Sequence, residues 1–368
     1  MSVSPERETR ELRLRQIRQE AQLRAESVAS VSPKFQTDRQ SGNGRGALQK
    51  FQADALASPE KGYYGLPLLK APPWTWEVPI YFFVGGAAGT SAMLASVGQL
   101  NGADRDMIRD ARWVAAIGGA ISPALLTADL GVPLRFLNML RIFKVQSPMS
   151  IGSWTLVAFS STAAAAALLT ELERRRMLRR IPVLTDAAEI ASALTGLILA
   201  TYTGVLVGAT AIPAWNENIS LLPIHFAASG ISTAVSLLEL RGHTSTAINK
   251  IGIGAATIET AIGASLELGK NPATEPLHHG PSGWTMRVAG LLSGPVPLAL
   301  RVLSLTTNSN SRRGNQLRKA AAISSVVGSL LTRFAWVYAG RASSKDPKVP
   351  LQLPGPARPD VKQIPADK

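Results

Sequence analysis

Long apolar runs separated by short charged segments dominate the chain from about residue 78 onward. Each run has about 17–23 residues, the length that an α-helix needs to cross about 30 Å of hydrocarbon. The runs carry almost no charge, and helices satisfy their own backbone hydrogen bonds inside a membrane. The pattern therefore predicts an all-α polytopic membrane protein with eight transmembrane helices in a bundle. The expected spans are residues 78–98, 113–131, 153–171, 187–209, 219–239, 250–267, 288–306 and 320–340.

The two ends of the chain differ from this central part. Residues 1–61 mix Arg, Glu, Gln and Ser, and we expect a charged flexible arm or a partner-docking segment there. Residues 342–368 are proline-rich and predict an extended tail. The membrane domain is expected over residues 62–341. Eight spans place both ends at one face of the membrane, called here the terminal face. The loops of the opposite face are richer in Lys and Arg, which favours a terminal face outside the cytoplasm.

Composition removes several kinds of redox centre. The chain has no cysteine, which excludes disulfides and iron–sulfur clusters held by cysteine. A haem between helices usually needs two axial histidines, and only His225 lies in an expected span. The adjacent His278 and His279 lie in a loop and are a weak metal candidate. The formal net charge of +14 comes largely from loop residues, such as those of 171–180. Membrane topology explains that placement better than binding of nucleic acid.

Six side chains with titratable or polar groups share one half of the membrane and are the candidates for function. Burying such groups in hydrocarbon is costly, so each needs a partner or a role. At a rise of 1.5 Å per residue, their depths run from the terminal face to about 12 Å below it. From shallow to deep they are Glu77, Asp129, Tyr202, His225, Arg333 and Glu259. By the same measure Arg301 and Glu189 lie toward the opposite face.

Each candidate has a structural alternative. Asp129 either serves a site or caps its helix and pairs with Arg135 in the adjacent loop. Glu259 and Arg333 are alternatively a structural ion pair, and Glu77 is alternatively a boundary residue that reaches toward water. The tyrosine and the histidine are alternatively ordinary helix-contact residues. The shared depth of the six favours a site over these separate explanations.

Small residues and prolines predict local geometry. The spacing of Gly85 and Gly89 predicts a close helix–helix approach. Pro295 and Pro297 lie inside the seventh apolar run and predict a kink there.

Four segments carry a resemblance to a known family. WTWEVPIYFFVGGAAGTSA (74–92) has a tryptophan, a Pro-Ile-Tyr-Phe-Phe run and a glycine run. ADLGVPLRFLNMLRIFKVQSPMSIGSW (128–154) contains Asp-Leu-Gly, Arg-Phe, Ser-Pro-Met and Gly-Ser-Trp. YTGVLVGATAIPAWNENISLLPIHFAASG (202–230) and RFAWVYAGRASSKDP (333–347) follow. Together they resemble the NrfD family, the membrane subunits of polysulfide-reductase-like complexes, over most of residues 62–347.

The resemblance implies a quinone-reactive membrane anchor subunit without its own haem or cluster. Such subunits pass electrons between the membrane quinone pool, menaquinone or ubiquinone, and a partner iron–sulfur protein. That protein serves a further catalytic subunit of the molybdopterin type or similar. The chain would then be a non-autonomous part of a respiratory oxidoreductase in the bacterial inner membrane, surrounded by lipid.

The resemblance also implies where the quinone binds. In the polysulfide-reductase branch the pocket involves the start of the first helix and a tyrosine of the fourth, which correspond here to Trp76–Glu77 and Tyr202. That branch uses a histidine and an asparagine near the helix start, where this sequence has Trp74, Thr75 and Glu77. Asp129 and Arg135 match the Asp-Leu-Gly…Arg segment and imply proton handling or pocket structure. We expect proton chemistry from Glu77, Tyr202, Asp129 and Glu259, and quinone contacts from Trp76, Glu77, Tyr202, His225, Arg135 and Arg333.

Two other functions fit parts of the pattern. In a secondary transporter, Glu259, Arg333 and the proline-containing seventh helix would form a midplane site, but the first and last four helices show no inverted repeat. In a purely structural anchor, the polar residues would only hold helices together.

Overall fold

The computed structural model describes residues 69–130, 134–177, 182–269, 272–307 and 311–345. The arm expected at residues 1–61 and nearly all of the tail expected after residue 341 lie outside the described residues. In the described part the regular structure is helical, and eight segments are long and apolar enough to cross a membrane. The prediction of an all-α protein with eight spans is thus confirmed.

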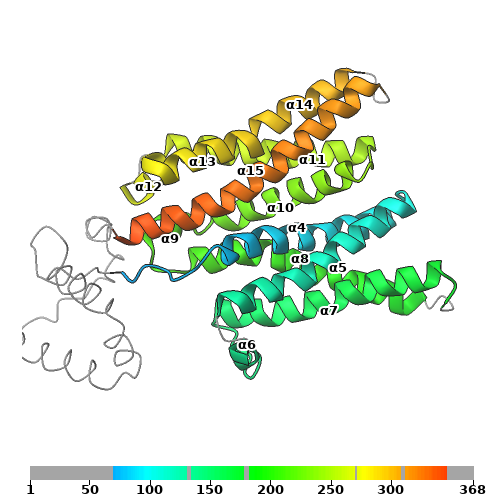
Figure 1. The fold of residues 1–368 in the computed structure, drawn as a ribbon, viewed down its shortest axis with the longest axis horizontal. Coiled ribbons are helices and arrows are strands. Elements are labelled where there is room, and N and C mark those ends of the chain that lie inside the picture. The colour runs from blue at the N-terminus through cyan, green and yellow to red at the C-terminus, as the bar shows by residue number, and fades with distance from the viewer. Residues whose placement is uncertain (1–68, 131–133, 178–181, 270–271, 308–310, 346–368) are drawn as a thin grey trace, which may run out of the picture. The chain divides into compact units, whose positions relative to one another are not determined.

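The spans form an ordered series along the chain (Figure 1). They are α4 (Glu77–Leu100), α5 (Arg105–Asp129), α7 (Pro148–Arg174), α8 (Pro182–Gly208), α10 (Leu221–Leu240), α11 (Thr246–Leu268), α13 (Gly280–Ser293) with α14 (Pro295–Thr306), and α15 (Arg312–Lys345). Four short helices connect spans at the terminal face, where α4 begins and α15 ends. They are α6 (Leu134–Met139), α9 (Pro213–Asn216), the 3-10 helix η2 (Pro272–Thr274) and α12 (Glu275–His278).

Several helices begin earlier than the apolar runs. α7 begins at Pro148, where the Ser147 hydroxyl accepts a hydrogen bond from the Ser150 amide. α11 begins at Thr246, where Ser245 caps the Ile248 amide in the same way, with N and O 3.2 Å apart. A serine cap satisfies one of the free amides of the first turn. These first turns lie outside the apolar runs and are fixed by the serine caps.

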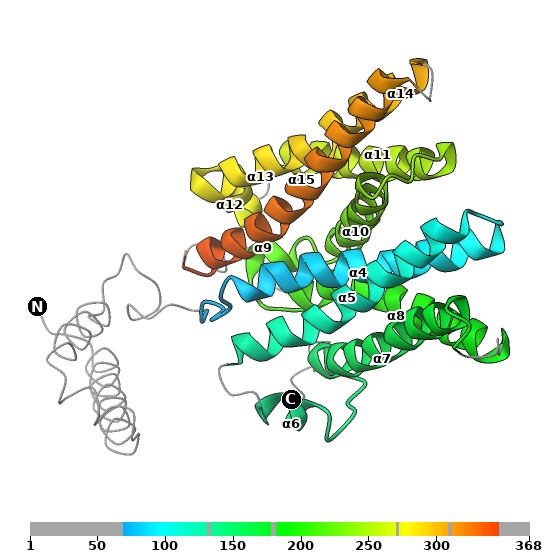
Figure 2. The ribbon, with the colours of Figure 1, turned by 45° about the vertical axis from the view of Figure 1, so that its right-hand side comes forward.

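The spans pack as two four-helix bundles (Figures 1 and 2). α4, α5, α7 and α8 form the first bundle, and α10, α11, α13–α14 and α15 form the second. The bundles meet where α10 packs on α4 and α8, and where α15 packs on α4.

Glycines permit the closest helix contacts of α4. Gly89 lies against the backbone of Gly196 on α8, and neither position has room for a Cβ atom. This confirms the close approach predicted for Gly89. Gly85 has a looser environment, since a Cβ there would be 3.5 Å from the Ser122 hydroxyl.

The seventh span is broken rather than smoothly bent. α13 ends at Ser293, Gly294 has φ −101° and ψ −94°, and Pro295 begins α14. Proline lacks the amide that would continue the hydrogen-bond ladder of α13. The kink predicted from Pro295 and Pro297 is therefore confirmed, with Gly294 as its hinge.

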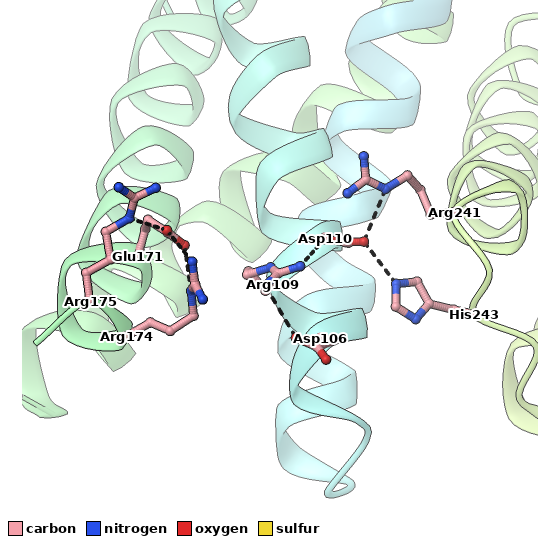
Figure 3. Close-up of polar contacts among 8 residues, drawn as sticks. All are labelled: Asp106, Arg109, Asp110, Glu171, Arg174, Arg175, Arg241 and His243. Carbon is pink, nitrogen blue, oxygen red and sulfur yellow. Dashed lines mark hydrogen bonds and ion pairs between the residues drawn. The ribbon is translucent and has the colours of Figure 1, made fainter.

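Polar contacts tie the helix ends together on the face opposite the terminal face (Figure 3). Asp110 of α5 accepts hydrogen bonds from Arg109 at 3.2 Å and from Arg241 at 3.2 Å, and lies 3.1 Å from His243 Nε2. Arg241 and His243 belong to the connection between α10 and α11, so Asp110 links the two bundles. Glu171 pairs with Arg174 and Arg175 at the end of its own helix, α7.

Candidate functional site

A small cavity lies at the terminal face of the first bundle, at the start of α4 and the end of α8. Its volume is about 80 Å³. Tyr202 of α8 lines it and is 7% exposed, and its hydroxyl has no hydrogen-bond partner among the described residues. The Tyr202 ring packs directly over Gly152 of α7, where a Cβ atom would overlap it. We call this space the Tyr202 cavity. The other residues around it are Trp74, Val78, Tyr81, Phe82, Leu126, Asp129, Leu130, Met139, Met149, Ser153 and Leu206.

Two carboxyl groups meet at the edge of this cavity. The Thr75 amide and hydroxyl both lie within hydrogen-bonding distance of Asp129 Oδ1, at 3.1 and 2.7 Å. The same hydroxyl also contacts the Glu77 carboxyl. A hydroxyl has one proton to donate, whereas an ionised carboxylate only accepts. The Thr75 hydroxyl can therefore donate to only one of the two carboxyl groups at a time. The cluster of Thr75, Glu77 and Asp129 thus places two carboxyl groups around one hydroxyl at the membrane edge.

The start of α4 presents a different tryptophan to the cavity from the one expected. Trp76 is 58% exposed and lies outside the lining. Trp74 lines the cavity, stacks on Trp215 at 5.1 Å between ring centroids, and meets the edge of Phe82 at 5.9 Å. The two residues differ because Trp76, the residue that precedes α4, is turned toward the outside of the protein.

Arg135 does not join this group. It lies exposed on α6 and forms no ion pair with Asp129. The alternative in which Asp129 pairs with Arg135 is therefore wrong, and Thr75 takes the position of the partner.

A second, larger cavity lies in the other bundle. Its volume is about 400 Å³, and it shares no lining residue with the Tyr202 cavity. His225 of α10 and Glu259 of α11 form its buried end, with exposures of 4% and 2%. We call it the Glu259 cavity. The other residues around it are Thr260, Gly263, Ala264, Leu266, Glu267, Leu277, His278, Met286, Arg287, Gly290, Leu291, Pro295 and Thr332.

The state of His225 follows from its partner. Trp336 Nε1 donates a hydrogen bond to His225 Nδ1 at 3.2 Å. Because Nδ1 accepts, the neutral ring carries its proton on Nε2. That nitrogen lies 3.9 Å from Glu259 Oε2, too far for a direct hydrogen bond.

Arg333 lines neither cavity. It donates to the Phe226 carbonyl at 2.9 Å, and its guanidinium lies 3.7 Å above the Phe226 ring. It forms no direct ion pair with Glu259, although the two charges interact at longer range. The direct contacts of the cation are a carbonyl and an aromatic face.

A line of tryptophans joins the two cavities. Trp74 of the Tyr202 cavity stacks on Trp215. Trp215 Nε1 donates to the Trp336 carbonyl at 2.7 Å, and Trp336 in turn donates to His225 of the Glu259 cavity. Trp215 and Trp336 are both fully buried. The structure thus divides the expected site between two cavities, which are connected by the contacts of these three tryptophans.

The half of the protein away from the terminal face contains buried ion pairs that the sequence reasoning missed. Arg112 of α5 contacts Glu189 of α8, and Arg301 of α14 donates to Glu239 of α10 at 2.7 Å. Glu189 and Arg301 were placed toward this face, but their partners lie at or just beyond the ends of apolar runs. These pairs could have been predicted from the rule that a charge within a membrane span requires a partner of opposite charge at similar depth.

A comparison with protein families identifies this architecture. The family model described as polysulphide reductase, NrfD, matches residues 69–343. The chain belongs to the NrfD family. It is a multi-pass membrane subunit of the polysulphide reductase type, with eight candidate spans. A search of curated proteins finds no match.

The family match covers both bundles, so both cavities lie within the NrfD domain. This NrfD chain has no cysteine, and hence no cysteine-held iron–sulfur cluster of its own. Among the described residues, no group of three or more His, Asp or Glu side chains is placed to hold a metal ion.

Proposed function

We propose that this NrfD chain exchanges electrons between a membrane quinol and a partner iron–sulfur protein, with the quinol ring bound in the Tyr202 cavity. The observation that carries the proposal is the meeting of a buried phenol and a two-carboxyl cluster around one apolar cavity at the membrane edge. The phenol can bond to a quinol oxygen, and the carboxyl cluster can take a proton toward water.

The lining of the Tyr202 cavity suits an aromatic head group, but the cavity is too small for one unless side chains move. Its volume of about 80 Å³ is below the range of about 300–1,000 Å³ typical of ligand pockets. Met139 and Met149 line it, and thioether side chains adapt readily to a new neighbour. Displacing these two methionines admits a ring between Trp74 and Tyr202.

The chemistry balances within this arrangement. Oxidation of a quinol to a quinone releases two electrons and two protons. The Tyr202 hydroxyl orients one quinol oxygen, and the Thr75–Glu77–Asp129 cluster accepts protons in turn and passes them to water at the terminal face. The electrons leave to a partner centre, because the chain contains no cysteine ligands for a cluster.

The partner would dock on the terminal face. The Tyr202 cavity opens near this face, and the short helices α6, α9 and α12 connect the spans there. Electron transfer requires short distances, so the iron–sulfur protein should lie over the first bundle. We propose in addition a further catalytic subunit, of the molybdopterin type or similar, and a place in a bacterial inner membrane.

Substitution of Tyr202 by phenylalanine tests the phenol. Tyr202→Phe keeps the ring over Gly152 and removes one hydroxyl. Loss of its hydrogen bond to quinol should cost about 1 kcal/mol, which lowers quinol-linked turnover by about fivefold. The measurement is turnover of the assembled complex with a soluble quinol. Tyr338→Phe is the matched control, since Tyr338 is 45% exposed on α15, away from the cavity. Equal turnover of both variants would remove Tyr202 from the site.

Substitution of Glu77 by glutamine tests proton transfer separately. Glu77→Gln keeps the size and the hydrogen bond from Thr75 but cannot titrate. We expect intact assembly, slower quinol oxidation and a changed pH–rate profile. Glu217→Gln, at an exposed glutamate near the terminal face, is the control for loss of surface charge. A wild-type profile for Glu77→Gln would leave Glu77 as a boundary residue.

A further inference from the structure

We propose that the Glu259 cavity is a second binding site, which takes the reduced, hydroxyl-bearing ring of a lipid-soluble hydroquinone. Its volume of about 400 Å³ falls in the range of about 300–1,000 Å³ found for ligand sites. Its walls are mostly apolar, and a few polar groups gather at the buried end. The argument for this site rests on its own contacts and does not require a ligand in the Tyr202 cavity.

Two glycines on the neighbouring helices α11 and α13 line the cavity. Gly263 of α11 and Gly290 of α13 both line it, and a Cβ atom built at either position would have no heavy atom within 4 Å. The missing side chains leave a gap between the helices. Ala264 and Leu291 beside the gap are exposed and apolar. A molecule dissolved in the lipid can therefore enter without crossing water.

The rim of the cavity favours a neutral ligand. Arg287 Nη2 and Glu267 Oε1 are 2.6 Å apart, and His278 Nδ1 lies 3.9 Å from Glu267. Arg287 and Glu267 thus pair directly with each other, whereas His278 Nε2 has no hydrogen-bond partner among the described residues. The phosphate of a phospholipid would have to break the Arg287–Glu267 pair, whereas an uncharged ring leaves it intact.

The buried end offers one donor and one acceptor with a gap between them. His225 Nε2 carries a hydrogen because Nδ1 accepts from Trp336. Glu259 Oε2 lies 3.9 Å away, and neither Glu259 oxygen makes a hydrogen bond of normal geometry, although the Ser229 and Ser293 hydroxyls approach. A buried carboxyl without a partner is costly, by about 1–3 kcal/mol.

A hydroxyl group fits this gap. Its oxygen accepts from His225 Nε2–H, and its hydrogen is donated to Glu259, which satisfies both groups at once. A hydroquinone supplies such a hydroxyl on a ring that can lie against Leu277 and Met286, with its tail in the opening between α11 and α13. The oxidised quinone has only acceptor oxygens, so the site should select the reduced form.

The test is equilibrium binding of a labelled decyl-benzohydroquinone to the full-length chain with its copurifying subunits in lipid nanodiscs. Gly263→Leu and Gly290→Leu place a side chain in the opening, and we expect each to weaken binding at this site at least tenfold, measured as the loss of one hydroquinone per chain at saturation. Gly254→Leu is the matched control, because Gly254 lies on the same helix α11, also faces open space and does not line the cavity. Its binding should equal that of the wild type.

A second variant removes the acceptor without filling the opening. Glu259→Leu deletes a carboxyl whose oxygens make no hydrogen bond of normal geometry, and in the assembled variant we expect hydroquinone binding to fall at least tenfold. Tyr202→Phe should leave hydroquinone binding in the Glu259 cavity unchanged. The result for this cavity can therefore be distinguished from the result for the proposed function. Unchanged binding in Gly263→Leu, Gly290→Leu and Glu259→Leu would overturn the proposal. Binding of the quinone as tight as that of the hydroquinone would overturn the proposal that the ligand donates a hydrogen bond. Competition by 1-decanol as strong as that by the hydroquinone would show that the site binds a simple lipid alcohol and does not recognise the ring.

Discussion

Arg301→Met is expected to destabilise the protein by about 3–5 kcal/mol, because it removes the cation that pairs directly with the buried Glu239 carboxylate. Arg301 has no exposed surface and Glu239 is 1% exposed. The guanidinium donates to Glu239 at 2.7 Å and to the Ser236 hydroxyl at 3.1 Å. Gly252 of α11 provides the space for it, since a Cβ atom there would meet the guanidinium. The pair joins α10 to α14 across the second bundle.

A double-variant cycle isolates this pair. The variant Arg301→Met with Glu239→Leu removes both charges, and such replacements are often neutral or stabilising. We therefore expect thermal unfolding in detergent to show a large loss for the single variant and recovery of most of it in the double variant. Arg313→Met, at an exposed arginine of α15, is the control. A double variant as unstable as Arg301→Met would show that the loss comes from packing and not from charge.

Gly152→Ala is expected to reduce quinol-linked turnover at least tenfold. The added methyl would occupy the position of the Tyr202 ring and hydroxyl, so the ring must leave its place beside the cavity. Overpacking of this kind costs about 1–3 kcal/mol, which α7, packed against α5 and α8, can absorb. The effect therefore falls on the geometry of the cavity more than on assembly.

The measurement compares turnover and assembly of the complex in parallel. Gly254→Ala adds the same methyl group in open space on α11 and should behave as the wild type. Normal turnover of an assembled Gly152→Ala complex would contradict the placement of the quinol beside Tyr202. Poor assembly with normal turnover per assembled complex would contradict it equally.

Local patterns explain what was predictable in the fold. The eight spans and the break near Pro295 depend on residues that are neighbours in the chain, since apolar length and a missing proline amide act within one helix. The earlier starts of α7 and α11 depend on capping serines outside the apolar runs. The shared depth of the candidate residues was also readable, because depth follows from position along a span.

Helix packing determined which of the candidate residues lie together. Equal depth places Tyr202, His225 and Glu259 at one level of the membrane but does not say which helices are neighbours. Packing into two bundles separates Tyr202 from His225 and Glu259. The exposure of Trp76 and the inward position of Trp74 likewise depend on how the start of α4 is turned toward its neighbours.

The sequence by itself determined the class of this protein, the number of its spans and its membership of the NrfD family, because these follow from apolar length and local motifs. Only the tertiary structure decided that Thr75 contacts both Glu77 and Asp129, that Arg301 pairs with Glu239, and that His225 and Glu259 line one cavity. Each of these contacts joins residues on different helices. Their partners are fixed by the close packing of side chains across helix interfaces, which no periodicity within one span records.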